Sequence, residues 1–359
     1  MHDPRLLFEK HKSGRRTTRF PGEENAPAAN HYLPENLLRS SPPELPETGE
    51  LDLVRHYTEL SRRNTGVNNV FYPLGSCTMK YNPCRNESIA AISEFANLHP
   101  YQDPEATQGI LEILYLAERY LTEISGLDEI SLHPAAGAHG ELTALMVIRK
   151  YFEKKNMNER RTVLMPDSAH GTNPASCTLA GFKTKKIKSC QETGLIDIED
   201  LKKNLGDDTA AIMVTNPNTL GLFEKDVQEI CALVHEAGGQ VYMDGANLNA
   251  IMGIARPADF GIDVMHFNLH KTFSTPHGCG GPGAGPIGVV RHLAPYLPVP
   301  RVIHTQGQYR LTSDLPDSIG QTRAFACNTG VVLRAFAYIL SLGANGIKRI
   351  AENAVLNAN

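Results

Sequence analysis

Residues 266–285, with the sequence HFNLHKTFSTPHGCGGPGAG, place a single lysine between an apolar run and a cluster of glycines. The residues just before Lys271, VMHFNL, have the composition of a buried strand, whereas those after it are too rich in glycine to pack a core. Lysine side chains normally lie on solvated surfaces. A lysine held at the end of a buried strand is better suited to act as a nucleophile toward an aldehyde.

Short apolar runs recur on both sides of this stretch, each bounded by turn residues. They are TVLMP (162–166), AAIMVTNP (210–217), GQVYMDG (239–245), DVMHFNL (263–269) and GPIGVV (285–290). Amphipathic segments such as DVQEICALVHEAG (226–238) separate them, and residues 107–126 carry apolar side chains at helical spacing up to the stop signal Gly126. This alternation predicts an α/β fold, in which helices cover a parallel or mixed sheet.

The composition is that of a soluble globular protein. The 359 residues are 41% hydrophobic and 21% charged, and the net charge of −4 argues against a nucleic-acid binder. No apolar run approaches the roughly 18 residues that a membrane span needs, and the start lacks the apolar core of a signal peptide. Seven cysteines without a CxxC pair indicate neither a disulfide framework nor a zinc site, so we expect a cytoplasmic or otherwise reducing location.

The two ends differ from the central region, residues 66–330, which we expect to form one large domain. Residues 1–65 are predicted to be an extended arm, because Pro, Gly and charged residues are too frequent there for packed elements. A basic cluster in this arm is either a clamp for a partner subunit or a solvated tail; its members are Lys10, Lys12, Arg15, Arg16 and Arg19. Residues 331–359 predict a helix, a loop and a second helix with an uncovered apolar face, which suggests the start of a small domain that continues further.

An amine at Lys271 suggests pyridoxal phosphate (PLP), an aldehyde cofactor whose ring acts as an electron sink. A PLP site also needs an acid at the ring nitrogen, an anion cradle for the phosphate and a flat group against the ring. Asp244 is the predicted acid, since it ends the run GQVYMDG at the edge where open sheets bind ligands. The alternative is that Asp244 caps the helix that follows it.

The cradle and the flat group have candidates at two further strand ends. Gly137, Ala138, His139 and Gly140 form a small-residue turn into a helix, whose free N–H groups attract phosphate. His170 follows TVLMP in the segment PDSAHGTNPAS and is the predicted flat group. The alternatives are an ordinary glycine turn and a structural histidine.

Two other patterns carry no chemistry. Residues 283–288 match GxGxxG as a string, but Pro286 lies inside it and the string leads into a strand, so it is no dinucleotide-binding turn. KTKKIK (183–188) is predicted to be the solvated face of an edge strand.

Five longer motifs are recognisable together. NLHKTFSTPHGCGGPGAGPIGV, SAHGTNPAS, PAAGAHGE, YMDGANLNA and YPLGSCTMKYNP closely resemble the PLP-bearing part of glycine decarboxylase, the P-protein of the glycine cleavage system. The resemblance is to subunit 2 of the two-subunit bacterial form and runs over essentially the whole chain. It implies a fold-type-I PLP-dependent enzyme with a mainly parallel seven-stranded sheet covered by helices. It also implies a smaller C-terminal domain, of which this chain holds only the beginning.

The resemblance assigns roles to individual residues. Lys271 matches the lysine that is joined to PLP, Asp244 the aspartate facing the ring nitrogen and His170 the histidine stacked on the ring. Further cofactor contacts are expected from Ala138, His139, Thr272, Asn173 and Ala246, and weaker substrate contacts from Ser76, Cys77 and Thr78 in GSCTMK (75–80). Cys279 is a departure, since the family usually has another glycine there.

The implied activity is that of an aminomethyl-transferring glycine dehydrogenase. Such an enzyme decarboxylates glycine with PLP and transfers the aminomethyl group to the lipoyl arm of the H-protein, in a heterotetramer with P-protein subunit 1. Two alternatives stay open on the residues alone. One is another fold-type-I PLP enzyme, either an amino-acid decarboxylase or an aminotransferase. The other is an inactive fragment that binds PLP or a partner.

Overall fold

The computed structural model describes residues 5–17, 22, 25–66, 69–70, 81–277 and 283–359. The chain divides into two compact units, Met1–Pro73 and Leu74–Asn359. The candidates Ser76, Cys77 and Thr78, and also Cys279, lie outside the described residues.

The first unit has little buried apolar surface. Its described elements are η1 (Leu7–Lys10), η3 (Ala29–His31), η4 (Glu35–Leu37) and α1 (Glu50–Ser61). No described residue of this unit belongs to a hydrophobic core cluster, and side chains such as Leu6 and Tyr32 are exposed. Arg15 of the basic cluster forms an ion pair with Asp52 at 2.7 Å. The described part of this unit therefore has no apolar core of its own.

The second unit is built on a seven-stranded sheet with the order β1-β7-β6-β5-β4-β2-β3. The strands are β1 (Glu129–Ser131), β2 (Thr162–Pro166), β3 (Lys183–Ile187), β4 (Thr209–Thr215), β5 (Gln240–Gly245), β6 (Val264–Phe267) and β7 (Ile287–Val289). The strands β3, β2, β4, β5 and β6, in that order in the sheet, pair in parallel with their neighbours. Strand β7 runs antiparallel to both β6 and β1. The mainly parallel sheet is confirmed, its apolar strands match the five predicted runs, and the lysine-rich β3 lies at an edge as predicted.

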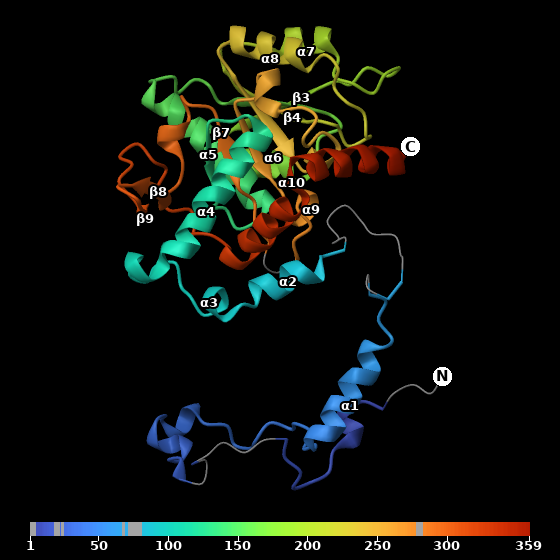
Figure 1. The fold of residues 1–359 in the computed structure, drawn as a ribbon, viewed down its shortest axis with the longest axis vertical. Coiled ribbons are helices and arrows are strands. Elements are labelled where there is room, and N and C mark those ends of the chain that lie inside the picture. The colour runs from blue at the N-terminus through green and yellow to red at the C-terminus, as the bar shows by residue number, and fades with distance from the viewer. Residues whose placement is uncertain (1–4, 18–21, 23–24, 67–68, 71–80, 278–282) are drawn as a thin grey trace. The chain divides into compact units, whose positions relative to one another are not determined.

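Helices cover both faces of this sheet (Figure 1). The described helices of this unit are α2 (Cys84–Ala90), α3 (Ser93–Ala96), α4 (Pro104–Ser125), α5 (Gly137–Lys154), α6 (Thr172–Leu179), α7 (Ile198–Asn204), α8 (Val227–Glu236), α9 (Leu269–Thr272) and α10 (Thr329–Ala358), with the short η5 (Leu248–Ala250), η6 (Pro257–Phe260) and η7 (Ala294–Tyr296). Of these, α2 packs against α10. A hairpin of β8 (Arg301–Thr305) and β9 (Gln308–Thr312) stands apart from the sheet. Side chains of β5 alternate between the two core clusters: Val241 and Met243 pack with α4, α8 and α10, and Tyr242 packs with α5 and α6.

Helix α4 ends at the predicted stop signal Gly126, but it begins at Pro104, ahead of the stretch predicted to be helical. The Asp103 side chain accepts the N–H of Glu105 at 3.0 Å, Pro104 takes the first helical position, and Gly126 ends the helix with a φ of 75°. The apolar face packs into the larger core cluster, with Ile110, Leu111, Leu114, Ala117 and Leu121 buried.

Helix α10 contains the predicted break. Gly343, with φ 60° and ψ −179°, separates two helical stretches. By length and composition α10 is apolar enough to cross a membrane. Several of its side chains, among them Val332 and Ile347, nevertheless lie in the hydrophobic core, and the helix packs against α2 and α4 (Figure 1). This is the behaviour of a core helix of a folded domain.

Candidate cofactor-binding and active site

The carboxyl ends of β2, β4, β5 and β6 border a cavity of about 470 Å³. Ala138, His170, Asp244, Ala246 and Lys271 all line it. These residues come from segments far apart in the sequence, and each follows or begins an element at this edge of the sheet. The amine, the acid, the flat histidine and the helix start therefore meet at one place, as the sequence predicts.

The predicted phosphate cradle is the amino-terminal end of α5. This helix begins at Gly137, after the extended residue Ala136. The first N–H groups of a helix have no partner within it, and the helix dipole favours an anion there. Gly137 allows Asn268 to approach closely, because a Cβ at this position would collide with Asn268 Oδ1. The ring of His139 serves the turn itself, since its Nδ1 accepts the N–H of Ala135 at 3.1 Å.

Asp244 lies near the end of β5 and is only 3% exposed. Its Oδ1 accepts the N–H of Ala246 at 2.9 Å, and Nε2 of His266 lies 3.4 Å from the same oxygen. The alternative role as a helix cap is met only in part, because Asn247 occupies the cap position of η5. Both contacts fall on one oxygen, which leaves Oδ2 for a ligand.

A second buried carboxylate belongs to Glu141, one turn into α5. Its two oxygens accept hydrogen bonds from the hydroxyls of Thr172 and Ser176, both at 2.9 Å. The Thr172 hydroxyl also lies 2.9 Å from Nδ1 of His170. Glu141 thus ties the start of α6 to α5 and orients the segment that carries the exposed His170 at the cavity.

Buried polar atoms near the cavity test whether it fits PLP. Within the described part of the chain, Thr215 Oγ1, Thr272 Oγ1 and both amide atoms of Asn173 are buried without a hydrogen-bond partner. An unsatisfied buried polar group costs about 1–3 kcal/mol, so such atoms are typical of a site that a ligand completes. Thr215 lines the cavity, whereas Asn173 and Thr272 sit on elements that border it without being among its lining residues. Together with Lys271 and the amino-terminal end of α5, these groups fit a phosphate-bearing aldehyde.

Four residues that line the cavity were not predicted from the sequence: Glu141, His266, Asn268 and Thr215. These residues lie inside or directly beside regular elements, where a polar side chain in one sequence looks like any other. For His266 the sequence held a signal that could have been used. Aligning the ends of β5 and β6 as parallel neighbours places His266 beside Asp244.

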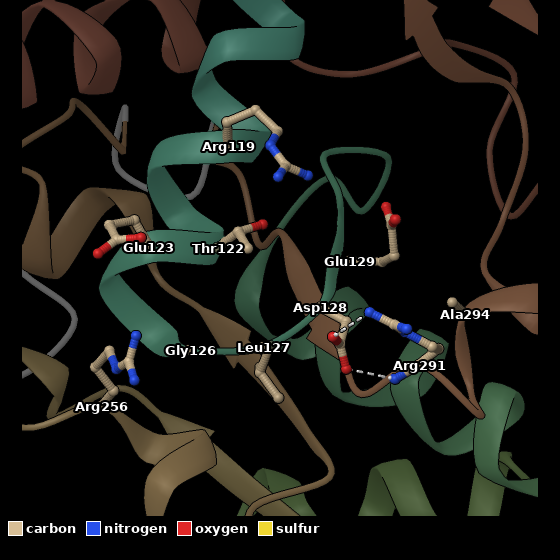
Figure 2. A pocket seen from close by; sticks show the side chains of 10 residues that line it. All are labelled: Arg119, Thr122, Glu123, Gly126, Leu127, Asp128, Glu129, Arg256, Arg291 and Ala294. Atoms are coloured by element: carbon tan, nitrogen blue, oxygen red, sulfur yellow. Dashed lines mark hydrogen bonds and ion pairs between the residues drawn. The ribbon is translucent and has the colours of Figure 1, made fainter.

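Another pocket has a different character. Figure 2 shows a pocket between the end of α4, the start of β1 and Arg291. Its volume is about 350 Å³. Arg291 pairs with Asp128 at 3.6 Å, and Arg256 and Glu129 add further opposite charges. No lysine is among the residues that line this pocket, so the pocket does not bring an amine to the start of a helix and offers no comparable site for an aldehyde.

Comparisons with known proteins agree with the fold and the motifs. Residues 26–315 match the family model of the glycine cleavage system P-protein. A probable glycine dehydrogenase (decarboxylating) subunit 2 from Caldanaerobacter subterraneus subsp. tengcongensis is 56% identical, over 99% of this chain and 73% of its own length. The protein of the same name from Bacillus licheniformis is 53% identical, over 99% of this chain and 74% of its own.

Two solved structures share the fold. A crystal structure of glycine decarboxylase (P-protein) of the glycine cleavage system, in inhibitor-bound form, has a TM-score of 0.72 at 21% identity, covering 89% of this chain and 72% of its own. The sphingosine-1-phosphate lyase of Burkholderia pseudomallei has a TM-score of 0.61 at 15% identity, covering 87% and 73%. The predicted fold-type-I α/β architecture is confirmed. With a family model matched over most of its length and relatives more than half identical to it, this chain belongs to the P-protein family of the glycine cleavage system.

Proposed function

We propose that this protein is the PLP-bearing subunit 2 of a glycine decarboxylase, that is, an aminomethyl-transferring glycine dehydrogenase. One observation carries the proposal: Lys271, Asp244 and the start of α5 line a single cavity in a chain of this family. The identity of more than 50% to relatives named for this activity supports the choice of glycine as substrate.

Each residue would have a distinct task. Lys271 would hold PLP through its Nζ atom, and the N–H groups at the start of α5 would bind the phosphate. Asp244 would keep the proton on the ring nitrogen, and His170 would lie against the ring. When bound, PLP supplies a ring that accepts the electron pair left by departing CO₂. The buried Asp244 carboxylate would stabilise charge where it develops in the transition state.

Thr215, Thr272, Asn173, Ala138 and Ala246 are further proposed cofactor contacts. His139 would act indirectly, because its ring holds the turn whose backbone N–H groups would bind the phosphate. Ser76, Cys77 and Thr78 stay predictions for substrate contacts, since they lie outside the described residues.

We further propose that the aminomethyl group passes to a lipoylated H-protein and that P-protein subunit 1 is the partner in a heterotetramer. The naming of the relatives as subunit 2 supports the second point. A cytoplasmic location is supported by the free thiols of all five described cysteines. The division into an arm (1–65), a PLP-binding domain (66–330) and the start of a small domain (331–359) remains a prediction.

The test is exchange of labelled bicarbonate into the carboxyl group of glycine. With PLP, lipoylated H-protein and the companion subunit present, we expect exchange by the parent protein. Asp244→Asn should lose roughly 100-fold or more, the size expected for a group that stabilises transition-state charge. Asp259→Asn is the matched control, because its carboxylate is exposed and pairs only with Arg256 within the described residues. Carrier-independent release of CO₂ from a different amino acid would instead assign another PLP-dependent activity.

A further inference from the structure

A row of buried polar side chains lies directly behind the proposed PLP site. Tyr242 and Asp244 project from the same face of β5, and the register between β5 and β6 sets His266 beside Asp244. Tyr242 Oη is 2.6 Å from His266 Nδ1, and His266 Nε2 is 3.4 Å from Asp244 Oδ1. The three residues are between 0% and 3% exposed, so water does not compete for these contacts.

The position of the proton on His266 follows from its neighbours. Burial raises the pKa of Tyr242 well above its ordinary value, so the phenol keeps its proton and donates it to Nδ1. Nδ1 is then an acceptor, and the ring carries a hydrogen on Nε2, which faces Asp244. The Asn268 Nδ2 atom lies 2.9 Å from Nε2. Exchanging the two ends of this amide by a half turn places its oxygen there, as a second acceptor of the same N–H.

The surrounding charges favour this arrangement. Glu141, Asp244 and His266 bring ligand atoms within 4.8 Å of one another. Glu141 accepts hydrogen bonds from two hydroxyls, whereas Asp244 is the carboxylate whose oxygen lies 3.4 Å from His266 Nε2. Other titratable groups on this side are Lys271, His170, His270 and His277, which line the same cavity, and Cys177, which acts on Tyr242. The neighbouring strand β7 places Ile287 beside His266.

We propose that His266 is a positioning residue that fixes the Asp244 carboxylate for the cofactor, and that Tyr242 fixes the tautomer of His266. The inference rests on the proposed PLP site. Asp244 Oδ1 is occupied by His266 and the N–H of Ala246, so the carboxylate has one fixed orientation and presents Oδ2 to a ligand. Removing His266 takes away the imidazole contact at 3.4 Å and leaves the N–H of Ala246 as the remaining recorded contact of Oδ1, so the carboxylate is held less firmly.

The variants separate this role from packing. His266→Leu removes both ring nitrogens, His266→Gln keeps an N–H near the place of Nε2, and Tyr242→Phe removes one oxygen from the row. His235→Gln is the matched control, because His235 Nε2 contacts Asp263 Oδ2 at 2.7 Å just before β6, in another histidine–carboxylate pair outside the cavity lining. Thermal melting of each apoprotein establishes that it folds. If His266→Leu does not fold, Tyr242→Phe carries the test.

Two quantities are measured on the full-length protein: the dissociation constant for PLP, and the pH midpoint of the visible absorbance of bound PLP. We expect His266→Leu to weaken PLP binding roughly 10- to 100-fold, the size of effect that follows when a buried charged group loses a polar partner. The midpoint should shift by about one pH unit. His266→Gln should recover most of both effects, Tyr242→Phe should shift the midpoint in the same direction, and His235→Gln should change neither.

Two results would overturn the inference. One is parental affinity and an unchanged midpoint in His266→Leu, or in Tyr242→Phe when that variant carries the test. The other is an equal loss in His235→Gln, which would make the effect one of general packing. Failure of the proposed function can be told apart from failure of this inference. If the proposed function is wrong, Lys271→Ala will still form a covalent bond to PLP. If Lys271→Ala loses that bond and the His266 variants behave as the parent, only the role of His266 is wrong.

Discussion

Replacing Glu118 by glutamine should change how the stability of this protein depends on pH. Glu118 lies on the buried side of α4 and is 7% exposed. Burial raises the pKa of Glu118 from 4.5 to about 8, although the nearby guanidinium of Arg301 opposes this effect. A carboxyl group with this pKa is protonated in the folded protein at neutral pH, whereas the unfolded chain releases the proton.

The sign and the size follow from this difference. Between pH 4.5 and about 8 the folded state binds more protons than the unfolded state, so stability falls as the pH rises. Each pH unit is worth about 1.4 kcal/mol, so the loss at pH 7, about 2.5 units above the ordinary pKa, reaches about 3 kcal/mol. Glutamine resembles the protonated carboxyl group and does not titrate. Relative to the parent, Glu118→Gln should therefore gain stability steadily from pH 5 to pH 8.

Urea unfolding at several pH values measures this gain. The free energy of unfolding of Glu118→Gln minus that of the parent should rise by about 3 kcal/mol between pH 5 and pH 8. Glu123→Gln, an exposed carboxylate on the same helix, is the control and should show a flat difference. A difference for Glu118→Gln that does not vary with pH would refute the reasoning.

Three further predictions concern packing and charge. Burial lowers the pKa of His133 from 6.5 to about 4, although the hydrogen bond that Nδ1 donates to Ala326 O opposes this effect. The parent should therefore lose about 3 kcal/mol as the pH falls through this range, and His133→Gln should flatten that loss in acid urea titrations. Gly140→Ala places a Cβ 2.7 Å from the carbonyl oxygen of Gly285, so it should cost about 1–3 kcal/mol in urea unfolding, and an unchanged midpoint would contradict the close contact. Arg334 donates two hydrogen bonds, of 2.9 and 2.7 Å, to the carboxylate of Glu87. A double-mutant cycle on this pair should give a coupling free energy of about 1 kcal/mol, and this coupling should weaken as salt is added. The absence of coupling would mean that solvent screens the pair.

Much of the fold was predictable because its central strands are apolar on both faces. The runs that became β2, β4, β5, β6 and β7 stand out between turn residues, and α4 carries both of its end signals. The short β1 and the β8–β9 hairpin were not predicted, since three to five residues with partly exposed side chains give no clear period. The antiparallel direction of β7 is set by tertiary pairing, which no local pattern shows.

The site was predictable where its residues end strands or begin helices. Asp244, His170 and Ala138 occupy such positions, and Lys271 follows a strand directly. Glu141 and His266 were missed because their function depends on contacts across elements, between α5 and α6 and between β5 and β6. Such pairings need the register of the sheet and the packing of its helices, and neither is written in a single segment.

The central claim is that Lys271 holds PLP covalently in the cavity at the carboxyl edge of the sheet. Incubation with PLP, reduction with borohydride and peptide mapping by mass spectrometry measures this directly. We expect the reduced cofactor on the peptide that contains Lys271 in the parent and in the control Lys225→Ala, whose lysine is exposed. Lys271→Ala should retain none. Equal labelling of Lys271→Ala, or labelling of a different lysine in the parent, would contradict the account.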